Sequence, residues 1–397
     1  MFLDLVRRRN PRLIEQAIAL HQAGKLPANA YVIDLDTVED NARAIAGEAA
    51  RFGLTVMAMT KQMGRNASFC RAVKRGGIAK AVAVDMECAR ATHRAGLETG
   101  HIGHLVQVPR HEADAAAALA PGWWTVFNLE KAKEAGVASR KRDRNQPLLA
   151  RLQAEGDQFY RGHEGGFPAS DVVAVADAID RAGGARFAGI TTFPALLFDP
   201  VSRKAKPTQN LETLRRASDA LAKSGRGRIE INAPGTTSSA TLHALADAGA
   251  TQVEPGHGLT GTTPLHAVED LPERPAVVYL SEVSHLFGSE AFCFGGGLYI
   301  DPVFPDYQVR GIVSREPTAA AIALRNVEIP APAAIDYYGM IDARGSPKPQ
   351  PGDSVVFGFR PQAFVTRAYV VGVSGLMRGE PTVEEIHDAA GRMMEWP

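Results

Sequence analysis

Cysteine is scarce in this sequence, with three residues among 397, and an odd, sparse set does not build a disulfide framework. This scarcity favours a reducing compartment, and we expect a cytoplasmic protein. No apolar run approaches the roughly 20 residues that a helix needs to span a bilayer. The opening MFLDLVRRRNPRL places its charges after its apolar residues, the reverse of a secretory signal. We therefore expect no membrane partner.

Net charge is absent as well, because 44 Lys and Arg residues cancel 44 Asp and Glu residues. A balanced chain carries no basic excess for nucleic acid, so we expect no nucleic-acid partner. The basic tracts SRKRDRN and SRKAKP are interpreted as solvated loops. The sequence also lacks a Gly-rich dinucleotide fingerprint after its first strand, which argues against a doubly wound open sheet.

What the sequence does contain is a regular alternation of short apolar runs and segments with helical periodicity. The candidate strands are 55–60, 79–84, 102–108, 123–127, 147–153, 187–193, 228–233 and 250–254. Eight such strands separated by helices predict an α/β fold of the (β/α)8 TIM-barrel type.

The domain organisation follows from changes in sequence texture. Residues 1–29 are predicted to be a helical leader, and residues 30–272 the barrel. After about residue 272, β-rich pieces are broken by Gly, Pro and Asp, and helical periodicity returns only near 382–394. Residues 273–397 are therefore predicted to be a mostly β domain with a terminal helix.

One lysine stands at the end of a short apolar run in LTVMAMTKQMGRN, where Val56 to Met59 are predicted to be a buried strand. Lys61 follows that strand, at the barrel end where function gathers. An arbitrary lysine in such a place usually covers apolar surface with its stem while its ammonium stays in water. Other features of the chain must therefore decide whether Lys61 serves chemistry.

Two loops after the last predicted strands suit a phosphate group, which in such barrels binds after strands 7 and 8. NAPGTTSSATLHALADAGA places Gly235, Thr236, Thr237 and Ser238 where a helix opens, although Thr237 or Ser238 could merely be an N-cap. VEPGHGLTG gives the next strand a Pro-Gly ending that allows close backbone approach. A lysine facing a phosphate across a barrel mouth indicates pyridoxal 5'-phosphate (PLP), whose aldehyde bonds to lysine.

These motifs resemble those of fold-type III PLP enzymes in the alanine-racemase-like superfamily. VIDLDTVEDNARAI is similar to that family's opening IDLDAL-x-x-N, and VMAMTKQMGRN is similar to its cofactor-lysine segment. The likeness extends from about residue 30 to residue 262, and more loosely beyond. It implies that Lys61 is the internal-aldimine lysine and that the substrate is a small-molecule amino acid.

The resemblance also implies the other cofactor contacts. EGDQFYRGHEGG occupies the place of a family loop that carries Asp and Arg, so Arg161 is expected to reach the phenolic oxygen of PLP. The residues expected to hold phosphate are Asn232, Gly235, Thr236, Thr237 and Ser238, with help from Gly256 and His257.

The sequence departs from the family pattern at two positions. Alanine racemases have an arginine at the position of Glu254, whereas the fold-type III decarboxylases have a glutamate there, as this sequence does. The arginine that follows in the decarboxylases is His257 here. A carboxylate near the pyridine nitrogen favours the protonated ring, a stronger electron sink. GITTFPA lacks the histidine that the family places under the ring, so Phe193 or Thr192 stands near that position and the phenyl face of Phe193 could stack instead.

The reaction that these features favour is racemisation or epimerisation at Cα, which needs an acid or base on each face of the substrate. Lys61 would serve one face. In the family, a tyrosine from the partner subunit's β domain usually serves the other, which implies an obligate homodimer. Tyr338 and Tyr337 are candidates, and Cys293 and His285 compete with them, although each could simply be a packed core residue.

Other functions of the same fold stay open. Glu254 suits a decarboxylase. His285 and Cys293 suggest a metal-assisted D-threonine aldolase or D-serine dehydratase, although these two residues are farther apart in the sequence than the metal ligands of those enzymes. His93, His101, His104 and His111 match no usual zinc spacing, so we expect no metal. The non-enzyme alternative is a PLP homeostasis protein, which has the barrel and lysine without the second domain.

Overall fold

A computed structural model describes residues 1–318, 323–331 and 333–396. Its internal contacts divide the chain into two compact units. The first unit, called the barrel unit here, comprises Ala42–Thr60 and Val73–Gly258. The second, called the β unit, comprises Met1–Asn41, Lys61–Ala72 and the chain from Leu259 onward. The chain therefore leaves the barrel unit for twelve residues, 61 to 72, between two barrel strands.

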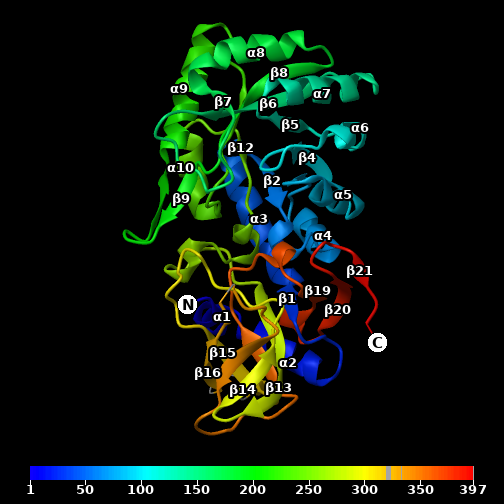
Figure 1. Cartoon of the computed structure of the whole chain (residues 1–397), viewed down its shortest axis with the longest axis vertical. Coiled ribbons are helices and arrows are strands. Elements are labelled where there is room, and N and C mark those ends of the chain that lie inside the picture. The colour runs from blue at the N-terminus through cyan, green and yellow to red at the C-terminus, as the bar shows by residue number, and fades with distance from the viewer. Residues whose placement is uncertain (319–322, 332, 397) are drawn as a thin grey trace. The chain divides into compact units, whose positions relative to one another are not determined.

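The barrel unit is built on eight parallel strands that close on themselves, because β12 pairs with β2 and β5 pairs with β6. Figure 1 labels β2, β4, β5, β6, β8 and β12 of this barrel and shows helices beside them. The strands are β2 (Thr55–Met59), β3 (Lys80–Val82), β4 (Glu98–Ile102), β5 (Trp123–Val126), β6 (Gln146–Gln153), β8 (Ala185–Thr191), β11 (Glu230–Asn232) and β12 (Gln252–Val253). The predicted (β/α)8 barrel is confirmed.

The helices of this unit alternate with the strands and cover its apolar core. They are α5 (Met86–Arg94), α6 (Ala113–Ala118), α7 (Leu129–Arg140), α8 (Val172–Arg181), α9 (Gln209–Lys223) and α10 (Leu242–Asp247). The core joins strand residues such as Leu148 and Ile190 to helix residues such as Ile179 and Leu214. Short strands β7 (Phe167–Pro168), β9 (Leu196–Asp199) and β10 (Lys204–Pro207) lie in the connections. Two helices cross the unit boundaries along the chain, α3 (Leu35–Arg51) and α4 (Ala67–Arg75).

One predicted barrel strand was misplaced. The apolar run at 102–108 suggested a strand there, but β4 is Glu98–Ile102. Its sequence ETGHI is polar, so apolar periodicity does not detect it, yet its last four residues are buried. His101 therefore lies within the strand near its C-terminal end, and His104 lies in the loop that follows.

The β unit contains a six-stranded antiparallel barrel, in which the strands run β14-β17-β16-β15-β18-β13 and β13 returns to β14. This confirms the predicted β-rich C-terminal part. The strands are β13 (Val277–Phe287), β14 (Glu290–Phe294), β15 (Arg310–Ser314), β16 (Leu324–Glu328), β17 (Tyr338–Asp342) and β18 (Ser354–Phe357). The amino-terminal helices α1 (Phe2–Arg9) and α2 (Pro11–Gln22) pack against an apolar cluster of this unit.

Two other sequence predictions change in this unit. The strand at the start of the predicted barrel domain, β1 (Ala30–Asp34), pairs with β13 and with β19 (Tyr369–Ser374), and thus belongs to the other sheet. The terminal helix predicted near 382–394 is wrong. This segment forms β20 (Thr382–His387) and β21 (Met393–Met394), because pairing of β20 with β19 overrides the helical propensity of its glutamates.

Within the described residues, none of the helices combines the length and apolar character needed to cross a membrane.

Candidate active site

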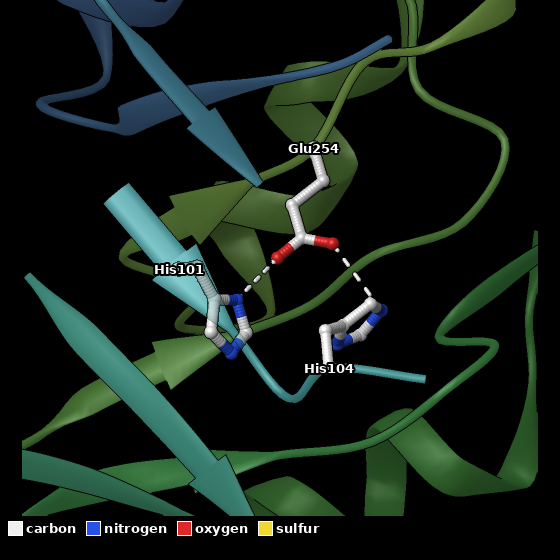
Figure 2. A group of neighbouring side chains, drawn as sticks. All are labelled: His101, His104 and Glu254. Carbon is white, nitrogen blue, oxygen red and sulfur yellow. Dashed lines mark hydrogen bonds and ion pairs between the residues drawn. The ribbon is translucent and has the colours of Figure 1, made fainter. Parts of the chain in front are cut away.

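A buried carboxylate marks the C-terminal end of the eight-stranded barrel. Glu254 follows β12 directly, and its side chain is almost wholly enclosed. Its Oε1 atom lies 2.8 Å from Nδ1 of His101, and Oε2 lies 3.3 Å from Nε2 of His104 (Figure 2). Asn232, at the end of β11, donates a third contact from Nδ2 to Oε1 at 2.9 Å. A buried charge requires such partners.

The partners of Glu254 are themselves fixed by hydrogen bonds. The Thr191 hydroxyl donates to Oδ1 of Asn232 at 2.7 Å, so the amide nitrogen of Asn232 faces the carboxylate. Nε2 of His101 lies 2.6 Å from the Thr125 hydroxyl. An ionised carboxylate only accepts, so the network assigns the ring proton to Nδ1 of His101. Two donors therefore meet at Oε1 of Glu254, and Oε2 accepts no hydrogen bond from the described residues.

His104 reaches Glu254 through a tight turn at Gly103. This glycine has a φ of +72°, and a Cβ atom there would lie 2.6 Å from the Thr125 carbonyl oxygen. Only glycine fits both conditions, so the turn fixes where His104 emerges after β4. The His104 ring meets Phe193 edge to face at 5.8 Å between centroids.

The electrostatics of this cluster favour a charged glutamate beside a neutral histidine. Burial lowers the pKa of His104 to about 3, and the nearby Glu254 does not offset that effect. Burial alone would raise the pKa of Glu254, but the hydrogen bonds from His101 and Asn232 favour the charged carboxylate, and the pKa of Glu254 is lowered. Glu254 is therefore ionised at neutral pH.

Acid should destabilise the barrel unit through His104. Between pH 6.5 and about 3 the unfolded histidine binds a proton that the folded one does not, so stability falls as the pH falls. We expect a loss of roughly 1.4 kcal/mol of unfolding free energy per pH unit from this group. Urea unfolding followed by fluorescence of Trp123 and Trp124 in β5 measures it. His104→Phe should remove this slope, and equal slopes in both proteins would contradict the assignment.

The two loops predicted to hold phosphate lie side by side. A Cβ atom on Gly258 would lie 2.5 Å from the carbonyl oxygen of Thr237, so the loop after β12 packs closely on the loop after β11. The backbone N–H of Thr236 donates to Leu196, and that of Ser238 donates to the Thr241 hydroxyl. The helix expected at Ser238 begins as the 3-10 turn Ser239–Thr241.

The other residues predicted for these loops have different positions. Asn232 is committed to Glu254 and Thr191, as described above. Gly235 packs on β9, where an added Cβ atom would lie 2.4 Å from the Leu196 carbonyl oxygen. Gly256 and His257 are half-buried after β12. Phosphate binding by these loops stays a prediction.

Lys61 belongs to the β unit, although it follows the barrel strand β2 after one residue, Thr60. It opens the 3-10 turn Lys61–Met63. Its Nζ lies 3.4 Å from Oε1 of Gln362 and 4.4 Å from the ring centroid of Phe364. Its predicted bond to the cofactor stays a prediction.

Asn66 anchors the segment that carries Lys61. Its Oδ1 accepts from the Phe69 backbone N–H at the start of α4, and its Nδ2 donates to the Val370 carbonyl oxygen and contacts Nδ1 of His387 at 2.8 Å. Asn66→Ala should cost roughly 3 kcal/mol of unfolding free energy, since it removes a cap and leaves buried acceptors unpaired. Urea unfolding checks this loss.

Asn128 provides the matched control, because it caps α7 through Lys131 but is exposed. Asn128→Ala should cost about 1 kcal/mol. Equal losses in the two variants would contradict the anchoring role of Asn66.

At the end of β6 the structure buries a different arginine from the one that the sequence suggested. Arg161 lies in solvent with its side chain 99% exposed, paired with Glu164 at 3.3 Å, so its predicted contact with PLP stays a prediction. Arg151, at the end of β6, is fully buried. Its guanidinium donates to the carbonyl oxygens of His163 and Phe193, and burial lowers its pKa to about 10.

The residues predicted for the second acid or base lie in the β unit. Cys293 is fully buried in β14, and burial raises the pKa of its thiol to about 12, which disfavours a thiolate base. His285 stacks on Phe292 at 4.7 Å and meets Tyr338 edge to face at 5.1 Å. Tyr338 is half-buried in β17, whereas Tyr337 is exposed. Their chemical roles stay predictions.

The buried cluster has the donor set for two kinds of ligand. One ligand atom from each of His101, His104 and Glu254 lies within 4.8 Å of the others, a spacing that a metal ion could use. The same Oε2 atom of Glu254, buried and accepting no hydrogen bond, also fits the protonated nitrogen of a pyridine ring. The spacing of His101 and His104 in the sequence indicated no metal site. Glu254 joins them only through the closure of the barrel.

The fold is the one shared by PLP-dependent racemases and lyases, and it typically binds PLP. The model of the alanine racemase N-terminal domain matches residues 33–264, and the chain belongs to this family. The resemblance that the sequence motifs indicated is thus confirmed. A second model, the YhfX-like C-terminal domain, matches residues 278–383. The Escherichia coli (strain K12) protein "Uncharacterized protein YhfX" is 38% identical over 399 residues, which cover 99% of this chain and 100% of that protein.

Solved structures share the fold at low sequence identity. D-threonine aldolase from Filomicrobium marinum gives a TM-score of 0.68 at 18% identity, covering 93% of this chain and 96% of its own. Alanine racemase from Clostridium difficile 630 in complex with cycloserine gives 0.64 at 13%, covering 92% and 99%. D-threo-3-hydroxyaspartate dehydratase from Delftia sp. HT23 gives 0.62 at 16%, covering 90% and 97%.

Proposed function

We propose that this protein is a PLP-dependent enzyme that acts at Cα of an amino acid, as a racemase or epimerase. The observation that carries the proposal is Oε2 of Glu254, a buried carboxylate oxygen that accepts no hydrogen bond from the described residues. It lies at the end of a barrel strand in a member of the alanine racemase N-terminal domain family. Bound PLP supplies an electron sink for a carbanion at Cα.

The residues of this chain then have distinct tasks. Glu254 holds a proton on the pyridine nitrogen, and His101 with Asn232 keeps that carboxylate charged and oriented. The loops after β11 and β12 bind the phosphate. Lys61 holds the cofactor aldehyde covalently and moves a proton on one face of Cα.

The second face is assigned to Tyr338 of the partner subunit in a homodimer. The tyrosine is half-buried in β17, and the β unit exposes the apolar residues Phe287 and Tyr337, which are 76% and 64% accessible. Exposed aromatic residues of this kind are enriched in interfaces. Light scattering of the purified protein tests the homodimer, and a monomer would contradict it.

A lyase is the second candidate, and Glu254 itself favours it. A carboxylate keeps the pyridine ring protonated, and the stronger electron sink also supports loss of a carboxyl group or of a side-chain fragment from Cα. Racemisation and the lyase reaction differ in their substrate and in which bond to Cα is broken.

The test is an absorbance spectrum of the purified protein before and after borohydride, followed by peptide mapping. A band near the visible edge that borohydride removes, with the adduct on Lys61, would support PLP binding. Incubation with L- and D-amino acids in deuterated water then distinguishes exchange at Cα with inversion from release of carbon dioxide or an aldehyde. A band without any turnover would favour a cofactor-carrier protein, and no band after addition of PLP would overturn the proposal.

A further inference from the structure

His104 has a buried ring whose polar atoms lack partners. The residue is 1% exposed, and neither Nδ1 nor Nε2 makes a hydrogen bond within the described part of the chain. Neighbouring His101 differs, since both of its ring nitrogens have hydrogen-bond partners. A buried polar group without a partner costs about 1–3 kcal/mol. Buried polar side chains in native proteins are usually hydrogen-bonded, so the unpaired ring of His104 requires an explanation.

The second unpartnered atom of the site lies next to this ring. Oε2 of Glu254 is 3.3 Å from Nε2 of His104, and both atoms are without hydrogen bonds among the described residues. Because the imidazole is neutral at pH 7, the contact is not an ion pair under those conditions. Three polar atoms, two from His104 and one from Glu254, thus remain available at one place in the barrel unit.

An aromatic group borders the same place. Phe193 contacts the ring of His104 at 5.8 Å, that of Tyr160 at 5.7 Å and that of His163 at 5.9 Å between centroids. Phe193 follows β8, where the sequence lacks the histidine of the family pattern. A flat ligand with hydrogen-bonding ring atoms suits aromatic neighbours and unpartnered nitrogens together.

We propose that His104 is a cofactor-contacting residue, which hydrogen-bonds through its ring nitrogens to the heteroaromatic ligand that Glu254 holds. The inference rests on the proposed function and adds to it a polar contact from the loop after β4. A neutral imidazole offers one donor and one acceptor, so His104 binds and orients the ligand without exchanging charge with it.

The role predicts effects of opposite sign on stability and on binding. His104→Phe and His104→Leu remove two unsatisfied nitrogens, so the cofactor-free variants should unfold at the same temperature as the parent or higher. Both should bind pyridoxamine 5'-phosphate roughly 10-fold more weakly, by the loss of a hydrogen bond. This probe carries no aldehyde, so its affinity does not depend on a covalent bond to Lys61. Fluorescence titration and thermal unfolding of the full chain give the two readouts.

His111→Phe is the matched control, because His111 is an exposed histidine after the same strand, and it should change neither readout. Unchanged affinity in both His104 variants would overturn the inference, as would a joint loss of stability and affinity in both, the sign of a structural role. A parent protein that binds no pyridoxamine 5'-phosphate would overturn the proposed function instead. The parent protein could instead bind one equivalent of zinc that competes with pyridoxamine 5'-phosphate and is lost in both His104 variants. That result would identify a metal site and overturn the cofactor contact.

Discussion

Replacement of Lys61 by alanine should abolish the borohydride-reducible absorbance band and lower turnover by roughly 10³- to 10⁴-fold, the range expected when a positioned proton-transfer group is lost. The effect is large because the proposal gives one amine two tasks, holding the cofactor aldehyde and moving the Cα proton. Lys61→Arg should lose the band equally, since a guanidinium keeps the charge but does not form the bond.

The control for this change is another lysine of a barrel strand. Lys80 begins β3, at the N-terminal end of the strand, and its ammonium lies 5.4 Å from the Trp123 ring centroid. In barrels of this kind that end contributes to stability and not to chemistry. Lys80→Ala should therefore keep the band. An intact band and an unchanged rate in Lys61→Ala would remove the basis of the proposed reaction.

Replacement of Glu254 by glutamine should lower turnover by roughly 10²-fold while the protein still binds cofactor. The amide oxygen of glutamine can accept from Asn232 as the carboxylate does, so the fold is kept. What is lost is the negative charge that holds a proton on the pyridine nitrogen. The measurement is kcat together with the cofactor affinity, and kcat should change far more than affinity.

Glu230→Gln serves as the comparison, because Glu230 begins β11 and accepts a hydrogen bond from the Thr251 hydroxyl. It should leave kcat unchanged. A Glu254→Gln variant with parental kcat would show that the pyridine nitrogen does not depend on this carboxylate.

The parts of the fold that local periodicity encodes were predictable. Seven of the eight barrel strands lie largely within their predicted ranges, because each is a short apolar run set off by helical periodicity, whereas β4 shares only Ile102 with its predicted range. The strand β4 was displaced because its sequence ETGHI is polar, and His101 is buried there through hydrogen bonds to residues far away in the chain. The contact with Glu254 spans 153 residues, a separation that no local pattern records.

The candidate site was predictable where the chemistry is encoded by motifs, and less so where it depends on packing. Glu254 and the loops after β11 and β12 follow strand ends, so spacing and composition could identify them. Arg151 could not, because its sequence neighbours LARLQ do not distinguish a buried guanidinium from the exposed one of Arg161. The terminal strand β20 was mistaken for a helix because its pairing with β19 is a tertiary contact.

The order in which the chain is synthesised determines when residues 61–72, the segment that carries Lys61, can make their contacts in the β unit. Asn66 binds Val370, which is 304 positions later in the chain, so its anchor does not exist until almost the whole polypeptide has been made. At about 5–20 residues per second a ribosome needs roughly 15–60 s to cover that separation. The strands β3 to β12 emerge during this interval, so barrel pairing can begin before Val370 is available to Asn66. Capture of a cofactor by Lys61 would then be one of the last events in the maturation of the protein.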